Sequence, residues 1–481
     1  MQSFEESMVK FIGREKELNR LGEFKSKHTA SFILIKGRRR IGKSRLIQEF
    51  GQSFTHVYFF AGLPPDEHIT AQHQLEEFSR QIAREFKTAQ AQYKDWGDAF
   101  GAVSERVQKG KTLLVFDEIS WMGSKDETFL GKIKNLWDLQ LKNNHQLIFI
   151  ICGSASAWIE KNILNNTGFV GRISYTLTLE ELPLNYCSEF WPANISAYEK
   201  LKVLAITGGI PKYLEEINPK WSAEENIKKL CFSKGGFLVN EFDHMFSDIF
   251  LRKSFLYRQI METLSTGTKE QTYIAQTLDL EHRGRLSEYL WELEEAGFIT
   301  RDYTWNLKTG QDMKLSKYRL SDNYSRFYLK YIVKNQSKIK RNSFELKSMT
   351  SLPEWNTIMG LSFENLVLNN RRLLFKQLNI FPEEIISENP FFQHKTERSA
   401  GCQIDYMIQT KFNTLYVCEI KFSKAAIGSN IIEEVQNKIK AITLPRGFSC
   451  RPVLIHVNGV SIDVIDADYF SQIIDFSDFL K

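Results

Sequence analysis

The sequence predicts a multi-domain α/β chain whose first part is a parallel sheet. Its 481 residues exceed one ordinary core and correspond to about three or four domains. Between residues 31 and 180, short apolar segments alternate with helical stretches, a pattern typical of a parallel sheet covered on both faces. An α/β pattern resumes at Trp355 and runs to the end of the sequence.

Composition places the chain among folded, water-soluble proteins. Hydrophobic residues make up 42% and charged residues 25%, and the formal charge of +5 permits a nucleic-acid partner without requiring one. Residues 1–10 do not resemble a secretory signal, and the longest apolar run, residues 147–159, is too short to span a membrane. The six cysteines are scattered without a CxxC pair. We therefore expect a cytoplasmic protein without a membrane segment or a cysteine zinc site.

The pattern along the chain divides it into four segments. Residues 1–182 form the predicted core, whose strands are expected at 31–35, 56–60, 112–116 and 146–152. Three further segments follow, a helical one at 183–250, a helix-helix-helix-hairpin at 251–335 and an α/β domain at 345–481. The polar, basic stretch 334–347 is the expected linker.

A phosphate-binding loop follows the first strand. The pattern GxxxxGK[ST] is matched at every fixed position by Gly37, Arg38, Arg39, Arg40, Ile41, Gly42, Lys43 and Ser44. A strand leads in and a helix, 45–50, leads out, so backbone N–H groups and the helix N-terminus can surround a phosphate. Lys43 is expected on the β- and γ-phosphates of ATP, and Ser44 on Mg²⁺.

Two acidic residues end the strand at 112–116. Asp117 is expected to hold Mg²⁺, and Glu118 to act as the general base that orients the attacking water. The next strand ends at Ser154, a candidate sensor of the γ-phosphate. Further on, Arg172 precedes a strand at 174–179, and either an arginine finger or a surface arginine fits that position.

The motifs in this order resemble a known family. Residues 11–18, Phe-Ile-Gly-Arg-Glu-Lys-Glu-Leu, resemble the FxGRExEL entry helix of the archaeal-type ATPases, which belong to the AAA+-related STAND class. The phosphate loop, the acidic strand, the Cys-Gly-Ser turn and Gly208-Gly209-Ile210-Pro211 follow in the family's order. The resemblance implies a P-loop ATPase core with a helical lid, in which Pro211 contacts the adenosine. It covers about the first 330 residues and leaves the oligomeric state open, a homo-oligomer included.

The segment 251–335 resembles a winged helix. Helices at 271–278 and 282–296 precede a hairpin near 300–321, and the exit Tyr-Arg-Leu-Ser-Asp at 318–322 supports the resemblance. Arg283 and Arg285 lie near the start of the second helix, where DNA contacts are usually made. The same helix carries four glutamates, which repel phosphates, so DNA contact and protein contact both stay open.

Three features of the last segment place carboxylates together. A helix at 355–374 carries Glu364 on its apolar face, and a strand at 402–408 points Asp405 away from its apolar side. On the strand 415–422, Glu419 and Lys421 share a face about 6.6 Å apart.

An aspartate followed by Glu-x-Lys, after a helix with a glutamate, resembles the PD-(D/E)xK nuclease core, a restriction-endonuclease-like α/β domain. The resemblance implies that Asp405 and Glu419 ligate Mg²⁺ or Mn²⁺ with help from Glu364, and that Lys421 acts on the water or the phosphorus. Gln436 matches a glutamine of the following helix, whereas Ile404 replaces the motif's proline.

Three functional hypotheses follow from these motifs. The first is an ATP-dependent switch coupled to a Mg²⁺-dependent DNA nuclease. The second is a nucleotide-dependent scaffold or regulator with an inactive nuclease fold, in which Asp405 pairs with the neighbouring charges. The third, a DNA-binding transcriptional regulator, rests on the winged helix alone.

Overall fold

The chain folds into two compact units. The computed structural model describes residues 10–64, 66, 68–154, 156–250, 254–280, 283–397 and 400–480. Unit 1 comprises Met1–Leu182 and Met245–Leu251, and unit 2 comprises Pro183–His244 and Arg252–Lys481. Unit 1 thus contains residues 1–182, and most of the segment predicted as a helical lid belongs to unit 2.

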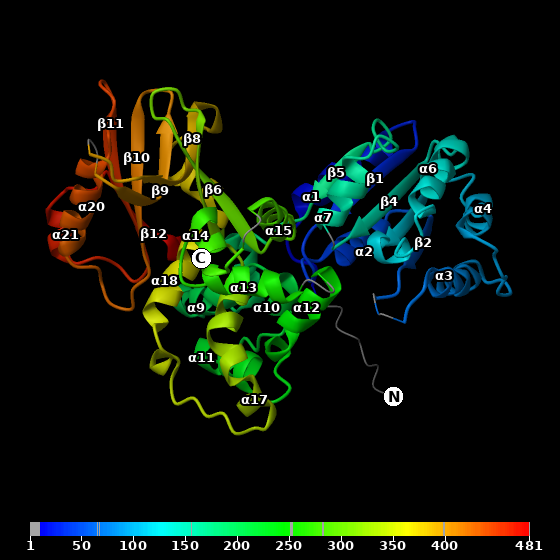
Figure 1. Ribbon diagram of the computed structural model, residues 1–481, viewed down its shortest axis with the longest axis horizontal. Coiled ribbons are helices and arrows are strands. Elements are labelled where there is room, and N and C mark those ends of the chain that lie inside the picture. Colours follow the sequence, from blue (N-terminus) through cyan, green and yellow to red (C-terminus); the bar gives the residue numbers. More distant parts are fainter. Residues whose placement is uncertain are drawn as a thin grey trace. The chain divides into compact units, whose positions relative to one another are not determined.

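Unit 1 is a five-stranded parallel sheet in the order β2-β3-β4-β1-β5 (Figure 1). Its strands are β1 (Ser31–Lys36), β2 (His56–Ala61), β3 (Thr112–Asp117), β4 (Leu147–Gly153) and β5 (Tyr175–Thr178). Every residue of β1, β3 and β4 is buried because helices cover both faces. The insertion of β4 between β1 and β3 puts the ends of all three strands side by side at one edge.

Helices surround this sheet and bury an aromatic-rich core. They are α1 (Glu15–Gly22), α2 (Lys43–Gly51), α3 (Ala71–Phe86), α4 (Trp96–Arg106), α5 (Ile119–Met122), α6 (Phe129–Leu139) and α7 (Ser156–Ile159). Phe60, Phe78, Trp96 and Phe116 pack ring against ring between α3, α4 and the strands. Such ring pairs add to the burial of apolar area and hold the strands in register.

Unit 2 begins with short helices and continues through three helices and a hairpin, the order that the sequence predicts. These elements are α8 (Leu184–Cys187), α9 (Ala197–Thr207), α10 (Pro211–Glu215), α11 (Ala223–Ile227), α12 (Glu241–Phe250), α13 (Ser254–Leu264), α14 (Gln271–Thr277), α15 (Arg283–Glu295), β6 (Ile299–Trp305), β7 (Asp312–Leu320), α16 (Asn323–Phe327) and α17 (Val333–Lys340). The last residues of α12 belong to unit 1.

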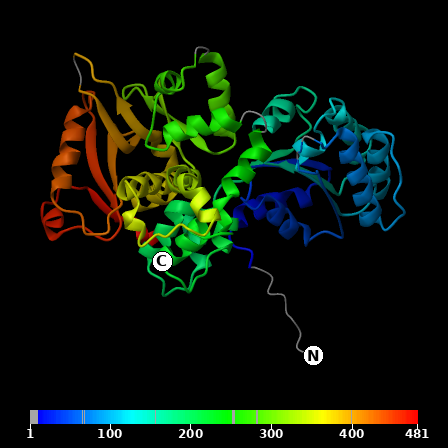
Figure 2. The ribbon, with the colours of Figure 1, turned by 60° about the horizontal axis from the view of Figure 1, so that its bottom comes forward.

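A second five-stranded sheet, in the order β12-β11-β10-β9-β8, forms the C-terminal part. Its strands are β8 (Ile385–Gln393), β9 (Cys402–Thr410), β10 (Thr414–Lys421), β11 (Ser449–His456) and β12 (Gln472–Asp475). The helices are α18 (Trp355–Asn369), α19 (Arg371–Gln377), α20 (Asn430–Ala441) and α21 (Ile462–Asp466). In Figure 2, α18 (yellow) lies beside the sheet (orange to red), and α20 packs against β9.

The single helix predicted at 355–374 is wrong, because Asn370 divides it into α18 and α19. The backbone of Asn370 leaves the helical region (φ −115°, ψ 18°), and its side chain donates to the Leu366 carbonyl at 2.8 Å. Its Oδ1 accepts from the Leu184 N–H at 3.0 Å. An asparagine with such partners ends a helix, since its side chain replaces backbone hydrogen bonds.

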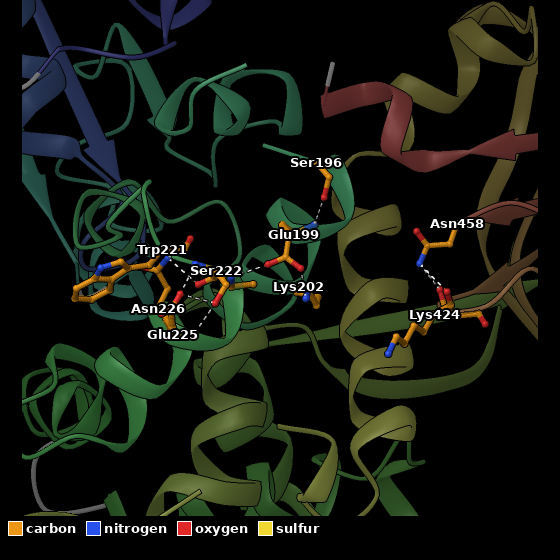
Figure 3. A network of polar contacts seen from close by, with 11 residues as sticks. Ser196, Glu199, Lys202, Trp221, Ser222, Glu225, Asn226, Lys424 and Asn458 are labelled. Atoms are coloured by element: carbon orange, nitrogen blue, oxygen red, sulfur yellow. Dashed lines mark hydrogen bonds and ion pairs between the residues drawn. The ribbon is translucent and has the colours of Figure 1, made fainter. Parts of the chain in front are cut away.

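The first helices of unit 2 are joined to the C-terminal sheet by further contacts. Lys200 donates to the Leu480 carbonyl at 3.4 Å, and the Tyr198 ring stacks on Phe422 with centroids 5.7 Å apart. Figure 3 shows the neighbouring polar network, in which Glu199 of α9 accepts from the Ala223 N–H that begins α11, at 2.8 Å. Segment 183–244 and the C-terminal sheet therefore pack as one body.

The β6–β7 hairpin is also engaged within unit 2. The Trp305 indole N–H donates to Gln409 at 2.6 Å, and Gln409 donates to the Leu307 carbonyl at 2.9 Å. Asn389 of β8 donates to the Tyr303 carbonyl at 3.2 Å. Trp305 and Leu307 are buried in the same apolar cluster as Phe391. One end of the hairpin is thus built into the C-terminal sheet.

Candidate nucleotide site

The phosphate loop begins directly after β1 and depends on two glycines. Gly37 has φ 150°, and a Cβ there would lie 2.5 Å from the Leu179 carbonyl oxygen. Gly42 has φ 94° and precedes Lys43, the first residue of α2. A side chain at either position would be strained, so the loop keeps its backbone N–H groups available only with glycine there.

Lys43 and Ser44 are the first two residues of α2, directly after the loop. The Lys43 ammonium is buried and donates to the carbonyls of Gly37 at 2.8 Å and Arg38 at 3.2 Å. The Ser44 hydroxyl donates to Asp117 Oδ2 at 2.7 Å. A hydroxyl and a carboxylate brought together beside a buried lysine fit the oxygen ligands that Mg²⁺ takes with a nucleotide.

Glu118 turns away from Asp117 and meets Ser154 at the end of β4. Its backbone adopts φ 49°, and its carboxylate accepts from the Ser154 N–H at 3.0 Å and from the Ser154 hydroxyl at 2.9 Å. Burial, followed by the Asp117 charge, raises the pKa of Glu118, whereas Lys43 opposes the shift. A buried carboxylate with a raised pKa beside a phosphate loop suits a general base.

Cys152 is a neighbour of this site that the sequence did not single out. Its thiol lies 2.8 Å from Asp117 Oδ1, which also accepts from the Glu118 N–H at 2.9 Å. Burial, followed by the Asp117 charge, raises the pKa of the Cys152 thiol, so it stays protonated and donates. Cys152 therefore helps to orient one carboxylate oxygen while the other faces Ser44. The signal was its place near the end of β4, two residues before Ser154.

Arg14 is the second residue that sequence reasoning left without a role. It is 6% exposed and donates to the Ile41 carbonyl of the phosphate loop at 3.2 Å and to the Glu180 carbonyl at 2.6 Å. Its guanidinium also pairs with Glu17 of α1 at 3.3 Å. The planar fork of arginine thus ties the entry helix, the loop and the segment after β5 together.

We expect Arg14→Lys to weaken ATP binding by about three- to tenfold, because a lysine cannot donate to both carbonyls at once. The measurement is the Kd of ATP by calorimetry, together with hydrogen exchange of the loop amides, which should become faster. The matched control is Arg20→Lys on the same helix, where the arginine is exposed and paired with Glu23. Equal Kd values for the two variants would refute a role of Arg14 at the loop.

Arg172 lies at the other edge of the sheet. It precedes β5, which runs parallel to β1, whereas the phosphate loop follows β1. Its guanidinium makes two-pronged contacts with Asp138 at 2.8–3.1 Å, and these raise the pKa of Arg172. This placement favours the surface arginine over an arginine finger acting within the same chain.

The remaining predicted nucleotide ligands lie on both units. Arg38 is buried and lies 3.6 Å from the Met245 sulfur, and Arg40 has a left-handed backbone, φ 69°. Pro211 is the first residue of α10 in unit 2, after Gly208 with φ 59°. Its contact with adenosine stays a prediction.

The C-terminal cluster brings Asp405, Glu419 and Lys421 together, and adds Lys438 of α20. The Lys438 ammonium contacts both Asp405 Oδ1, at 3.3 Å, and Glu419 Oε2. Lys421 lies 3.1 Å from Glu419 and 3.0 Å from Glu434. Lys438 was not predicted from the sequence. The feature that could have identified it is its position three residues after the buried Val435 of the same helix.

Burial raises the pKa of two carboxyl groups in this region. The pKa of Asp405 rises to about 6, through burial and then the Glu419 charge, and that of Glu364 rises to about 7, through burial and then the Asp405 charge. Among the described residues, no three carboxylate, imidazole or thiol groups are arranged to hold a metal ion. An ammonium lies between two of the predicted ligands instead.

Fold and site together define a P-loop ATPase domain. Residues 11–217 match a family described as an ATPase domain predominantly from Archaea, so this part of the chain is similar to the ATPase domains of that family. The family's match ends within the helical segment of unit 2.

Other comparisons extend over more of the chain. An uncharacterised protein of Methanocaldococcus jannaschii is 27% identical over 358 residues, which are 74% of this chain and 75% of that protein. Among solved structures, a Walker-type ATPase of Pyrococcus abyssi is 16% identical, with 66% of this chain and 96% of that one covered and a TM-score of 0.49. The ORC2 protein of Aeropyrum pernix is 13% identical, with 71% and 98% covered and a TM-score of 0.41. Within the described part of the chain, no helix is long and apolar enough to cross a membrane.

Proposed function

We propose that the chain is an ATP-hydrolysing switch whose output is carried by unit 2. The contact of Ser44 with Asp117, at 2.7 Å beside the buried Lys43, carries the proposal. A serine from the helix after the loop and an aspartate from another strand are brought within hydrogen-bond distance, as a shared Mg²⁺ would require.

We assign each residue of the site a task. Lys43 would bind the β- and γ-phosphates, and Ser44 with Asp117 would hold Mg²⁺, which would neutralise charge on the phosphate oxygens. Glu118 accepts the proton of the attacking water, and Ser154 holds Glu118 in place through two donors. Cys152 keeps Asp117 turned toward Ser44.

The packing of unit 2 supports the output step. Gly208–Pro211, which the family resemblance assigns to the nucleotide-contacting lid, lies in segment 183–244. That segment is hydrogen-bonded to Asn370 and Leu480 of the C-terminal part. A movement of the lid on nucleotide binding therefore carries the C-terminal sheet with it. The direct test is Mg²⁺-dependent ATP hydrolysis by the whole chain and by its Glu118→Gln variant.

A second candidate function is metal-dependent DNA cleavage by the C-terminal cluster. It rests on Asp405 and Glu419, two carboxylates that share one cation, Lys438, beside Lys421. A Mg²⁺ or Mn²⁺ ion could take the place of the ammonium between them, because the two neighbouring carboxylates need a positive charge in either case. The alternative is a scaffold, in which the two lysines neutralise the carboxylates permanently.

If the cluster is a nuclease, Asp405→Ala should abolish Mn²⁺-dependent cleavage of DNA and remove one Mn²⁺ site, while ATP hydrolysis is unchanged. Lys421→Ala should keep the Mn²⁺ site and lose cleavage, since an ammonium is not a metal ligand. The measurements are cleavage of linear, circular and single-stranded DNA, with EDTA as the metal-free arm, beside calorimetric Mn²⁺ titration. Asp466→Ala, at an exposed position of α21, is the control. No cleavage and no lost site would establish the scaffold.

The hairpin contacts bear on the DNA-binding regulator. In the winged-helix interpretation β6–β7 is the wing, yet its end is held by Gln409 and Asn389 of the C-terminal sheet. Because this end of the hairpin already contacts the C-terminal sheet, the contacts support a role for it in protein-protein contact. Arg285 of α15 is exposed and keeps a DNA contact through that helix open.

A further inference from the structure

A small pocket at the far edge of the unit 1 sheet gathers three lysines. It lies where β1, β3 and β4 begin, about 20 Å along the strands from the edge where the phosphate loop follows β1. Four segments line it: 24–29 before β1, Phe54 before β2, Lys111 before β3, and residues 145–148 before and within β4. This edge is separate from the nucleotide site.

The lysines of this pocket, Lys25, Lys27 and Lys111, lie against aromatic rings. Their ammonium groups stand 4.1–5.6 Å from the ring centroids of Phe50, Phe24 and Phe54, respectively. Lys25 also donates to the Ser53 hydroxyl at 2.9 Å. These neutral contacts hold the three side chains in place without cancelling their charge.

Within the part of the chain that the structure describes, none of the three lysines forms an ion pair with a carboxylate. Burial, and then the charge of Lys111, lowers the pKa of Lys25, as expected where like charges meet. Most surface lysines of such a protein are solvated singly, whereas these three come from two separate segments, 24–29 and the residue directly before β3, to one cavity.

The size and polarity of the pocket define its ligand. The cavity measures about 50 Å³, a size that suits an oxyanion such as one phosphate group. His145 and Gln146 add donors to its lining, and His28 and Lys109, which are close in sequence to the lining residues Lys27 and Lys111, are exposed. A chain of phosphates can therefore cross this edge while one of them enters the pocket.

We propose that the Lys25, Lys27 and Lys111 pocket binds a backbone phosphate of a nucleic acid. The ATPase core would then contribute a nucleic-acid contact of its own, remote from the ATP site and independent of the winged-helix arginines. The contact carries no sequence information, because phosphates are the same at every position.

The test compares two variants of equal charge. Lys27→Gln with Lys111→Gln removes two pocket lysines, whereas Lys16→Gln with Lys94→Gln removes two exposed lysines elsewhere on unit 1. Binding of a labelled DNA duplex is followed by fluorescence anisotropy between 50 and 200 mM salt. The pocket variant should bind about three- to tenfold more weakly, and the slope of log K against log salt should fall by about one to two.

Three results decide the proposal. A loss confined to the pocket variant, with ATP hydrolysis and the melting temperature unchanged, supports it. Equal losses of affinity in the two variants would show that the effect comes from net charge alone, and would overturn the proposal. The proposal would also be overturned if the wild-type protein did not bind the duplex at 50 mM salt. Because ATP hydrolysis is measured separately, failure of this proposal leaves the ATPase proposal standing.

Discussion

Glu118→Gln should lower kcat for ATP hydrolysis by about 10²–10⁴-fold while ATP still binds. Glutamine keeps the size of the side chain and can still accept from Ser154, but it cannot take a proton from water. Because burial raises the pKa of Glu118, the wild-type kcat should fall as pH drops toward a value above 4.5, the ordinary one for glutamate. That acid limb should disappear in the variant.

Two further variants separate binding from chemistry. Lys43→Ala should lose ATP binding, because the buried ammonium that meets the phosphates is gone. Ser154→Ala should bind ATP and hydrolyse it at a rate between those of the wild type and Glu118→Gln, since it removes one of two donors to Glu118. ATP affinity is measured by calorimetry and turnover by phosphate release. Wild-type turnover in Glu118→Gln would show that another group is the base.

Asp302→Ala should lower the free energy of unfolding of unit 2 by about 3–5 kcal/mol, the usual cost of leaving a buried charge unpaired. Arg319 is 7% exposed and donates to Asp302 at 2.9 Å, and it also donates to Asn365 of α18. Asp302 is on β6 and Arg319 on β7, so the cluster joins the hairpin to the C-terminal part. Hydrogen exchange of the β6 and β7 amides in denaturant measures the loss.

Two comparisons make this test specific. Glu262→Ala breaks an exposed pair with Arg258 on α13 and should cost less than about 1 kcal/mol. Asp302→Leu combined with Arg319→Met removes both charges and should be far milder than Asp302→Ala alone. If the single and double variants were equally destabilised, the loss would come from packing and not from the unpaired arginine.

Contiguous motifs are the features that a sequence predicts most directly. The phosphate loop occupies eight neighbouring residues, and its glycines, its lysine and the following helix are local features. Asp117 and Glu118 were predicted from their place at the end of a second apolar strand after the phosphate loop, and Ser154 from its likeness to a polar residue in many ATPases of this architecture. The hairpin and the strands that carry Asp405 and Glu419 followed from alternation and turn signals. The break at Asn370 was missed, because it depends on Leu184, 186 positions away.

The sequence by itself determined which residues carry the phosphate-loop motif and where the strands lie, because those choices depend on neighbours along the chain. Only the tertiary structure decided that Arg14 supports the loop, since its partners Ile41 and Glu180 lie 27 and 166 positions away. It also decided that Lys438 stands between Asp405 and Glu419, and that the helical segment packs with the C-terminal sheet. Contacts of this kind depend on which residues the fold brings close together. The helical or strand periodicity of the sequence describes only neighbours along the chain and therefore does not predict them.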